Sequence, residues 1–111
     1  MLFIAPSFEV IGEISETDFK EITEENPKPA ALICVKYGPE RAWRNDLEVN
    51  FINEVYVRLP FGIYIRIIEK FQIGRIVRIK GHLQGLRRHG DDSPRVELNA
   101  ERISFPQDDE S

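Results

Sequence analysis

Residues 61–83 decide the fold, and they read FGIYIRIIEKFQIGRIVRIKGHL. The first half of this stretch is ambiguous, because its isoleucines alternate as in a strand while its aromatic residues recur at a helical spacing. The period of two is carried by Ile63, Ile65 and Ile67, and the helical period by Phe61, Tyr64, Ile65, Ile68 and Phe71. Pro60 before the segment and Gly74 after it match the usual start and stop of a helix. The pattern therefore favours a short helix over residues 61–72.

The second half of the stretch continues as a strand from Arg75 to about Arg88. Apolar and polar residues alternate along it, which is typical of a strand with one buried face. Val77, Ile79 and Leu83 are expected to point inward, and the outward row consists of Arg78, Lys80, His82, Gln84 and Arg88. The outer face of this strand is therefore predicted to be basic.

Four further strands are predicted around this segment. They cover residues 8–15, 30–37, 47–59 and 95–105, and in the last of them Val96, Leu98 and Ala100 are expected to face inward. Five strands with one short helix between the third and the fourth is the order of an all-β OB-fold barrel. We expect this domain to cover residues 1–106, followed by a short acidic tail over residues 107–111 that is too polar and too short to fold.

Length and composition exclude several classes of protein. With 111 residues, 41% hydrophobic and 31% charged, the chain suits one soluble globular domain and contains no apolar run that could cross a membrane. The first twenty residues lack the pattern of a secretory signal, so we expect a cytoplasmic protein. Cys34 is the only cysteine and is expected in the core, and with only His82 and His89 beside it a zinc site lacks ligands. No nucleophile motif, P-loop or carboxylate pair is present, so we expect neither a cofactor nor an enzyme.

The net charge of −4 hides an uneven distribution along the chain. Residues 1–57 carry five basic and eleven acidic side chains, whereas residues 58–102 carry ten basic and five acidic ones. Salt screens surface charges over roughly 8 to 10 Å, so a basic groove acts on its surroundings by its own local sign. The second half of the chain is therefore compatible with binding to phosphate groups, and a solvated charged face is the alternative.

Several segments resemble bacterial single-stranded DNA-binding proteins. Residues 69–83 are similar to the family segment in which an acidic residue, an aromatic residue and a glycine precede a strand of the form V-x-I-x-G-x-L. Residues 54–62, which end Arg-Leu-Pro-Phe-Gly, resemble the family's third strand, and residues 10–14 resemble its opening strand. Residues 42–46, Ala-Trp-Arg-Asn-Asp, are similar to its tryptophan-bearing loop. The resemblance covers about residues 8–105.

This resemblance implies non-catalytic binding of single-stranded DNA and assembly into homodimers or homotetramers. The sequence departs from the family at Val55 and Arg88, where the family tends to have aromatic residues, whereas Trp43 and Phe61 match it. The tail lacks the long linker and apolar terminus by which the family recruits other replication proteins, so the resemblance does not extend to recruitment through the tail. A short chain of this kind also resembles primosomal replication protein N, a dimeric OB-fold relative that binds single strands mainly through basic residues.

Single-strand binding requires cations for the phosphates and flat side chains for the bases. Trp43 lies in a polar loop between Arg41 and Arg44, where an indole is expected to stack a base or to fold back onto the core. Tyr56 and Arg58 share the outer face of one strand, where Tyr56 either stacks a base or covers the barrel or an oligomer contact. Phe61 fits a core position as well as a stacking platform. The remaining candidates form a basic ribbon of Arg78, Lys80, His82, Arg87, Arg88 and Arg95.

Two functions follow from these residues. The first is non-catalytic binding of single-stranded DNA in replication, recombination, or plasmid or phage DNA metabolism. The second is a dimeric OB-fold module that binds proteins and acts as a replication accessory of the primosome type. Their dependence on salt separates them, because only binding to phosphates releases counterions in proportion to the contacts made.

Overall fold

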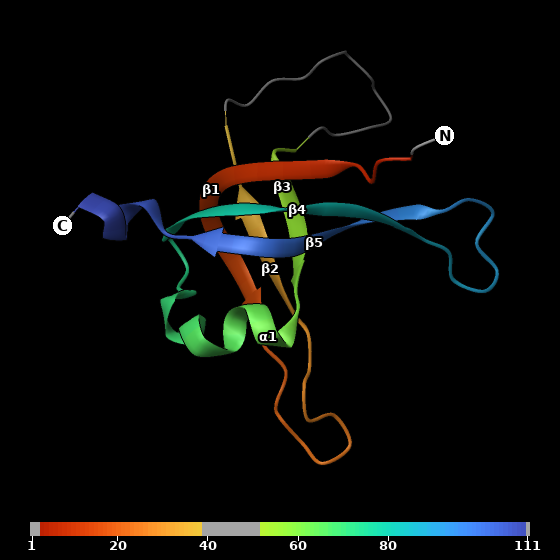
Figure 1. Cartoon of the computed structure of the whole chain (residues 1–111), viewed down its shortest axis with the longest axis horizontal. Helices are drawn as coiled ribbons and strands as arrows, with labels where there is room; N and C mark the ends of the chain where they lie inside the picture. Colours follow the sequence, from red (N-terminus) through yellow and green to blue (C-terminus); the bar gives the residue numbers. More distant parts are fainter. Residues whose placement is uncertain (1–2, 39–51, 111) are drawn as a thin grey trace.

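The computed structural model describes residues 3–38 and 52–110, and it contains a closed five-stranded barrel (Figure 1). The strands are β1 (Ser7–Asp18), β2 (Ala31–Lys36), β3 (Glu54–Leu59), β4 (Ile76–Leu86) and β5 (Arg95–Ser104). Their order around the barrel is β1-β2-β3-β5-β4. All pairs are antiparallel except β3 with β5, where Val57 lies opposite Leu98 in a parallel pair. This is the OB-fold predicted from the element order.

Alternation along the strands builds the core. Ile14, Ile33, Val57 and Ile79 are fully buried inside the barrel. On each strand, the side chains directly before and after the buried one point to the outer face, since successive side chains of a strand point to opposite faces. Cys34 is also buried, as expected, although its neighbours on either side, Ile33 and Val35, are the ones that belong to the central cluster. The barrel thus presents one apolar interior and a charged exterior.

A short helical segment lies between β3 and β4, as predicted. It consists of α1 (Phe61–Tyr64) followed by the 3₁₀ helix η1 (Ile65–Lys70), and the amide groups of Ile63 and Tyr64 donate hydrogen bonds to the carbonyl of Pro60. Tyr64 anchors the segment, because its buried hydroxyl donates a hydrogen bond of 2.8 Å to the carbonyl of Pro29. Burial raises the pKa of this hydroxyl. The helical period of the sequence therefore prevailed over the period of two.

A bulge in β5 changes which of its residues face outward. Gly81 lies opposite Ala100, and Lys80 lies opposite Arg102, so Glu101 is an extra residue in β5. Beyond Ala100 the alternation is therefore reversed, and Arg102 comes to lie beside Lys80 on the outer face. Gly81 permits this close pairing, since a Cβ atom at that position would overlap the carbonyl oxygen of Asn99.

Several predicted boundaries differ from the structure. β1 extends to Asp18, because a bulge after Ile14 lets it continue along β2. The third strand begins at Glu54; of its predicted earlier part, residues 47–51 lie outside the described residues and residues 52–53 are not in a strand. β4 ends at Leu86, and residues 87 and 88 belong to the loop that joins it to β5.

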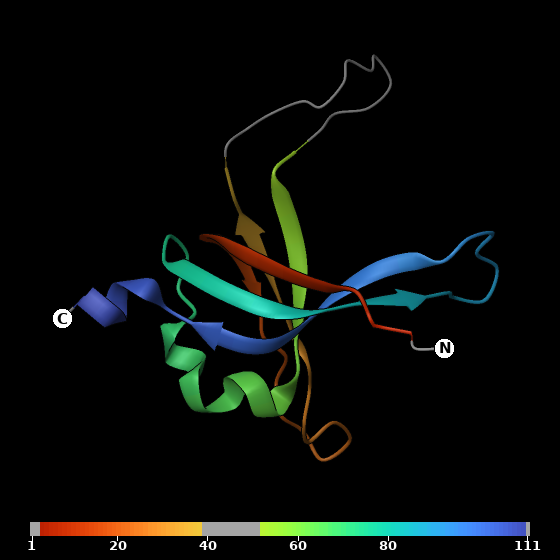
Figure 2. The same cartoon turned by 45° about the horizontal axis from the view of Figure 1, so that its top comes forward.

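Two predictions about burial and folding are wrong. Val96 was expected to face the core, yet it is 65% exposed, because it pairs with Gly85 on the β4–β5 hairpin, which projects beyond the barrel in both views (Figures 1 and 2). The tail was expected not to fold, yet Pro106–Glu110 forms the 3₁₀ helix η2. Among the described residues, no helix has the length and apolar character needed to span a membrane.

Candidate nucleic-acid interface

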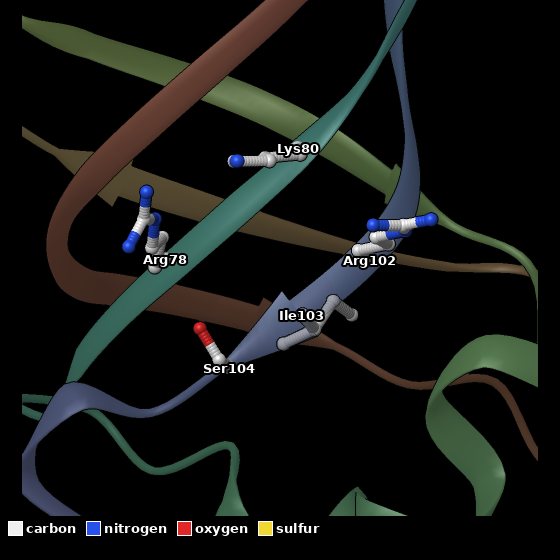
Figure 3. A pocket seen from close by; sticks show the side chains of 5 residues that line it. All are labelled: Arg78, Lys80, Arg102, Ile103 and Ser104. Carbon is white, nitrogen blue, oxygen red and sulfur yellow. The ribbon is translucent and has the colours of Figure 1, made fainter. Parts of the chain in front are cut away.

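A groove lined by three cations lies on the outer face of β4 and β5. Arg78 and Lys80 extend from β4, and Arg102 extends from the neighbouring β5, with Ile103 and Ser104 completing the lining (Figure 3). The strand register brings these residues together, because Arg78 pairs with Ser104 and Lys80 pairs with Arg102. The groove encloses about 510 Å³ and is open to solvent, so an extended chain has access to it.

One carboxylate partly neutralises this groove. Glu9, which lies opposite Lys80 on β1, accepts a hydrogen bond of 2.9 Å from Arg78 Nε and lies 3.7 Å from Lys80 Nζ. Arg102 has no ion pair with any residue in the described part of the chain. Arg78 and Lys80 thus share one carboxylate while Arg102 pairs with none among the described residues, and the groove keeps an excess of positive charge. These side chains are exposed, so each ion pair contributes little to stability and leaves the cations accessible to a ligand.

A second hollow adjoins the first on the other side of Lys80. It is lined by Ser7, Phe8, Glu9, Lys80, Gly81, Glu101 and Arg102. Because Lys80 and Arg102 line both hollows, the two form one surface across β1, β4 and β5. We call this surface, with its cations Arg78, Lys80 and Arg102, the β4–β5 groove.

His82 follows the groove along β4 but is already paired. Its Nδ1 lies 2.7 Å from a carboxylate oxygen of Glu101, the bulged residue of β5. The ring is about one-third exposed. His82 therefore has its own carboxylate partner and does not line the groove, although it was predicted to form one ribbon with Arg78 and Lys80.

The other predicted arginines of the ribbon lie on the β4–β5 hairpin. Arg87 and Arg88 follow the end of β4, Arg95 begins β5, and all three are exposed. Figure 2 shows that the hairpin to which they belong projects beyond the barrel. Asp91 organises this turn, since its carboxylate accepts a hydrogen bond from the amide of Arg88 and lies 3.8 Å from Arg95 Nε. The ribbon predicted from the sequence is thus divided between a groove on the barrel and a projecting hairpin.

The outer face of β3 carries Tyr56 and Arg58, as predicted, but both have partners. The hydroxyl of Tyr56 donates a hydrogen bond of 3.0 Å to Glu16, which raises the pKa of that hydroxyl. Arg58 donates a hydrogen bond of 3.2 Å to the side-chain oxygen of Asn99. Tyr56 is nevertheless 58% exposed, which leaves its ring accessible for stacking.

Acidic side chains lie between the β3 face and the groove. Asn99, which contacts Arg58, lies opposite His82 in the register and donates a hydrogen bond to Glu97. Glu101, the partner of His82, is the next carboxylate along β5. The described cations therefore form separate surfaces instead of one uninterrupted row.

Of the other four predicted site residues, the structure describes only Phe61. Phe61 is half-buried, packs against the core cluster and makes an edge-to-face contact with Tyr64, with ring centroids 5.8 Å apart. Arg41, Trp43 and Arg44 lie outside the described residues. Phe61 thus packs against the core, whereas Tyr56 is exposed on the outside of the barrel.

Arg102 is the groove residue that the sequence interpretation did not include. Strict alternation from Val96 through Ala100 would direct it inward, and only the bulge at Glu101 reverses this. A signal was present in the sequence, because Ala100 and Ile103 are three residues apart, and a spacing of three between inward residues indicates a bulge.

The described residues offer no site for a metal ion. Nowhere in residues 3–38 and 52–110 do three histidine, cysteine, aspartate or glutamate side chains meet in a ligating arrangement. The chemistry that this surface supports is the binding of anions by guanidinium and ammonium groups.

The sequence matches no family model and no curated protein. Solved structures do match, including the mitochondrial single-stranded DNA-binding protein Rim1 of S. cerevisiae, with a TM-score of 0.63 and 12% identity over 92% of this chain and 96% of that one. The small single-stranded DNA-binding protein of Streptomyces coelicolor matches with a TM-score of 0.58 and 17% identity, over 94% and 95% of the two chains.

A third match is the dimeric N-terminal domain of PriB from Thermoanaerobacter tencongensis, with a TM-score of 0.59 and 12% identity over 90% of this chain and 94% of that one. At these identities the similarity concerns the fold. The chain therefore shares its OB-fold, over nine-tenths of its length, with single-stranded DNA-binding proteins and with the N-terminal domain of PriB.

Proposed function

We propose that this protein binds single-stranded DNA without catalysis and that the β4–β5 groove is its main contact with the phosphate backbone. The observation that carries the proposal is the placement of Arg78, Lys80 and Arg102 around one open groove, in which Glu9 pairs with Arg78 and Lys80 while Glu101 pairs with His82. An excess of cations on an extended surface is what a polyanion requires. The OB-fold shared with single-stranded DNA-binding proteins supports the same function.

The bases require a second type of contact. Stacking on an aromatic ring contributes roughly 1 to 3 kcal/mol per base and does not depend strongly on sequence. The exposed ring of Tyr56 is one platform for such stacking, and Trp43 is a second one predicted from the sequence alone. Few platforms and many cations imply that phosphate contacts supply most of the affinity and that sequence preference is weak.

The hairpin extends this contact. Arg87, Arg88 and Arg95 are exposed residues of the hairpin, which projects from the barrel (Figure 2), so we expect them to contact a strand that leaves the groove. We place the protein in the cytoplasm, in replication, recombination, or plasmid or phage DNA metabolism, acting as a homodimer or homotetramer.

A second candidate is a dimeric OB-fold module that binds other replication proteins. The match to a dimeric PriB domain supports it, as do the carboxylates of Glu97 and Glu101, which interrupt the cations on β5. In that case affinity for DNA would be incidental, and the groove would contact an acidic protein surface.

The test is a titration with oligo(dT) followed by fluorescence anisotropy at several salt concentrations. If DNA binds through its phosphates, a plot of the logarithm of the association constant against the logarithm of the salt concentration should be linear. Its slope should be about −0.7 for each phosphate neutralised. Binding without a salt dependence, or no binding, would favour the protein-interaction module. In parallel, the fluorescence of Trp43 reports on stacking at its loop, since it is the only tryptophan. Release of nucleotides in the presence of magnesium would contradict a non-catalytic role.

A further inference from the structure

The bulge in β5 places a carboxylate and a guanidinium group side by side in the β4–β5 groove. Glu101 and Arg102 are consecutive residues, and both line the second hollow of the groove together with Lys80 from β4. In a regular strand, successive side chains point to opposite faces, so two neighbouring residues would be separated by the sheet. Glu101 is the extra residue at the bulge, and this lets it share the outer surface with Arg102. The groove therefore contains a hydrogen-bond acceptor beside its cations.

This acceptor has unused capacity. One carboxylate oxygen of Glu101, Oε1, lies 2.7 Å from Nδ1 of His82, and this contact holds the carboxylate in position. The second oxygen has no hydrogen bond or ion pair with any residue in 3–38 and 52–110, and the side chain is 59% exposed. Glu9 differs, because one of its oxygens binds Arg78 and the other lies 3.7 Å from Lys80 Nζ. Glu101 is thus the carboxylate of the groove that can accept a further hydrogen bond.

The backbone of DNA offers no donor to this acceptor, whereas the backbone of RNA does. Phosphate and ring oxygens accept hydrogen bonds, and only the ribose 2′-hydroxyl of RNA also donates one. This hydroxyl lies on the sugar carbon next to the one that bears the 3′-phosphate. A phosphate bound by Lys80 and Arg102 therefore brings a ribose hydroxyl close to Glu101, since the three side chains line the same hollow.

We propose that the β4–β5 groove binds single-stranded RNA as well as DNA and that Glu101 accepts a hydrogen bond from a ribose 2′-hydroxyl, which gives RNA the higher affinity. This inference rests on the proposed function and adds to it a class of ligand and a residue that distinguishes ribose from deoxyribose. The carboxylate also acts against DNA, because without a hydroxyl to bind it faces the phosphates as a like charge.

The preference is expected to be modest, because one hollow of the groove reads the sugar. The first hollow is lined by Arg78, Lys80 and Arg102 with Ile103 and Ser104, and no carboxylate is among the described residues of this lining. Phosphates bound there contribute equally in DNA and in RNA. One hydrogen bond to an exposed carboxylate corresponds to a preference of about 3- to 10-fold.

The test compares oligonucleotides of the same length and base that differ only at the 2′ position. Oligo(rU), oligo(dU) and 2′-fluoro oligo(U) are titrated with the full chain by fluorescence anisotropy at several salt concentrations. Fluorine keeps a ribose-like sugar conformation but donates no hydrogen bond. We expect oligo(rU) to bind about 3- to 10-fold more tightly than the other two. The three salt slopes should be equal, because the same phosphates are neutralised.

A pair of variants assigns the preference to Glu101. Glu101→Ala should abolish the difference between oligo(rU) and oligo(dU). Glu24→Ala removes the same charge from an exposed position in the β1–β2 loop and should leave the difference unchanged. The ratio of the two affinities is the readout, since the general effect of net charge cancels in it. Urea unfolding checks that both variants are folded, and the comparison of the three oligonucleotides on the wild type requires no variant.

The outcomes separate this inference from the proposed function. Equal binding of oligo(rU) and oligo(dU) by the wild type contradicts the inference and leaves the proposed function intact. The same holds for a preference that 2′-fluoro oligo(U) shares or that persists in Glu101→Ala. If the wild type binds neither oligo(dU) nor oligo(dT), the proposed function itself fails.

Discussion

The β4–β5 groove and the outer face of β3 are built by the same alternation, yet they differ in charge. In the groove, Arg78 and Lys80 share the carboxylate of Glu9, and Arg102 lies beside them without an ion pair to any described residue. On β3, Tyr56 is bound to Glu16 and Arg58 is bound to Asn99. An outward side chain is therefore not automatically available to a ligand.

The neighbouring strands decide this difference. β4 lies between β1 and β5, and the bulge in β5 places a third cation beside Lys80. β3 pairs with β2, and β2 pairs with the acidic end of β1. In this register Tyr56 lies opposite Cys34, and Cys34 lies opposite Glu16, so the carboxylate of Glu16 is within reach of Tyr56. Charge on adjacent strands, which is remote in sequence, determines which face is suited to bind an anionic ligand.

The largest expected effect concerns the pairing that creates the groove. In Gly81→Ala, the added Cβ would overlap the carbonyl oxygen of Asn99 and lie 2.9 Å from a ring carbon of Phe8, so β4 and β5 must separate. We expect a loss of at least about 3 kcal/mol in the free energy of unfolding, measured with urea. The matched control is Gly85→Ala on the same strand, where nothing lies within 4 Å of the added atom. Equal losses in the two variants would show that the close pairing is unimportant.

The next effect separates the groove from the other cations. The triple substitution Arg78→Gln, Lys80→Gln and Arg102→Gln should weaken binding to oligo(dT) on the order of 100-fold at low salt and reduce the salt slope by about 2, because three phosphate contacts are lost. The control is a triple substitution with the same change in charge at exposed positions off the groove, Lys20, Lys28 and Arg66. Similar losses in the two triple variants would mean that net charge, and not the groove, governs binding.

A smaller effect is expected on the β3 face. Tyr56→Ala removes an exposed ring and should weaken binding about 5-fold, within the range for one stacked base. Tyr56→Phe keeps the ring and loses only the hydrogen bond to Glu16, so anisotropy titration should give the affinity of the wild type. Trp43→Ala should likewise cost less than the triple groove variant. A larger loss from either aromatic substitution would reverse the ranking of the two faces.

The smallest effect concerns Glu9, the carboxylate that pairs with Arg78 and Lys80 in the groove. Glu9→Gln removes the charge that Arg78 and Lys80 share, so DNA no longer has to displace it, and affinity should rise about 2- to 5-fold. Glu21→Gln, at an exposed loop position, is the control for net charge. Weaker binding by Glu9→Gln would show that this carboxylate positions the two cations for DNA instead of competing with it.

The sequence alone determined the architecture and part of the candidate site. The patterns of five strands, together with Pro60 and Gly74 around the helix, were sufficient to predict the OB-fold, and alternation along residues 75–88 predicted the outward placement of Arg78 and Lys80. These features depend on local geometry, since the period of a strand and the conformations of proline and glycine are set within a few residues.

Only the tertiary structure decided which charged groups are free and which are paired. The bulge at Glu101 brings Arg102 into the groove, and the docking of η2 places Asp108 on Lys70 and Arg75, although 33 residues separate Asp108 from Arg75. Val96 is exposed for a similar reason, because the hairpin that carries it projects beyond the barrel. Contacts of this kind depend on strand register and chain packing, which join residues that are distant in the sequence, and no local pattern specifies them.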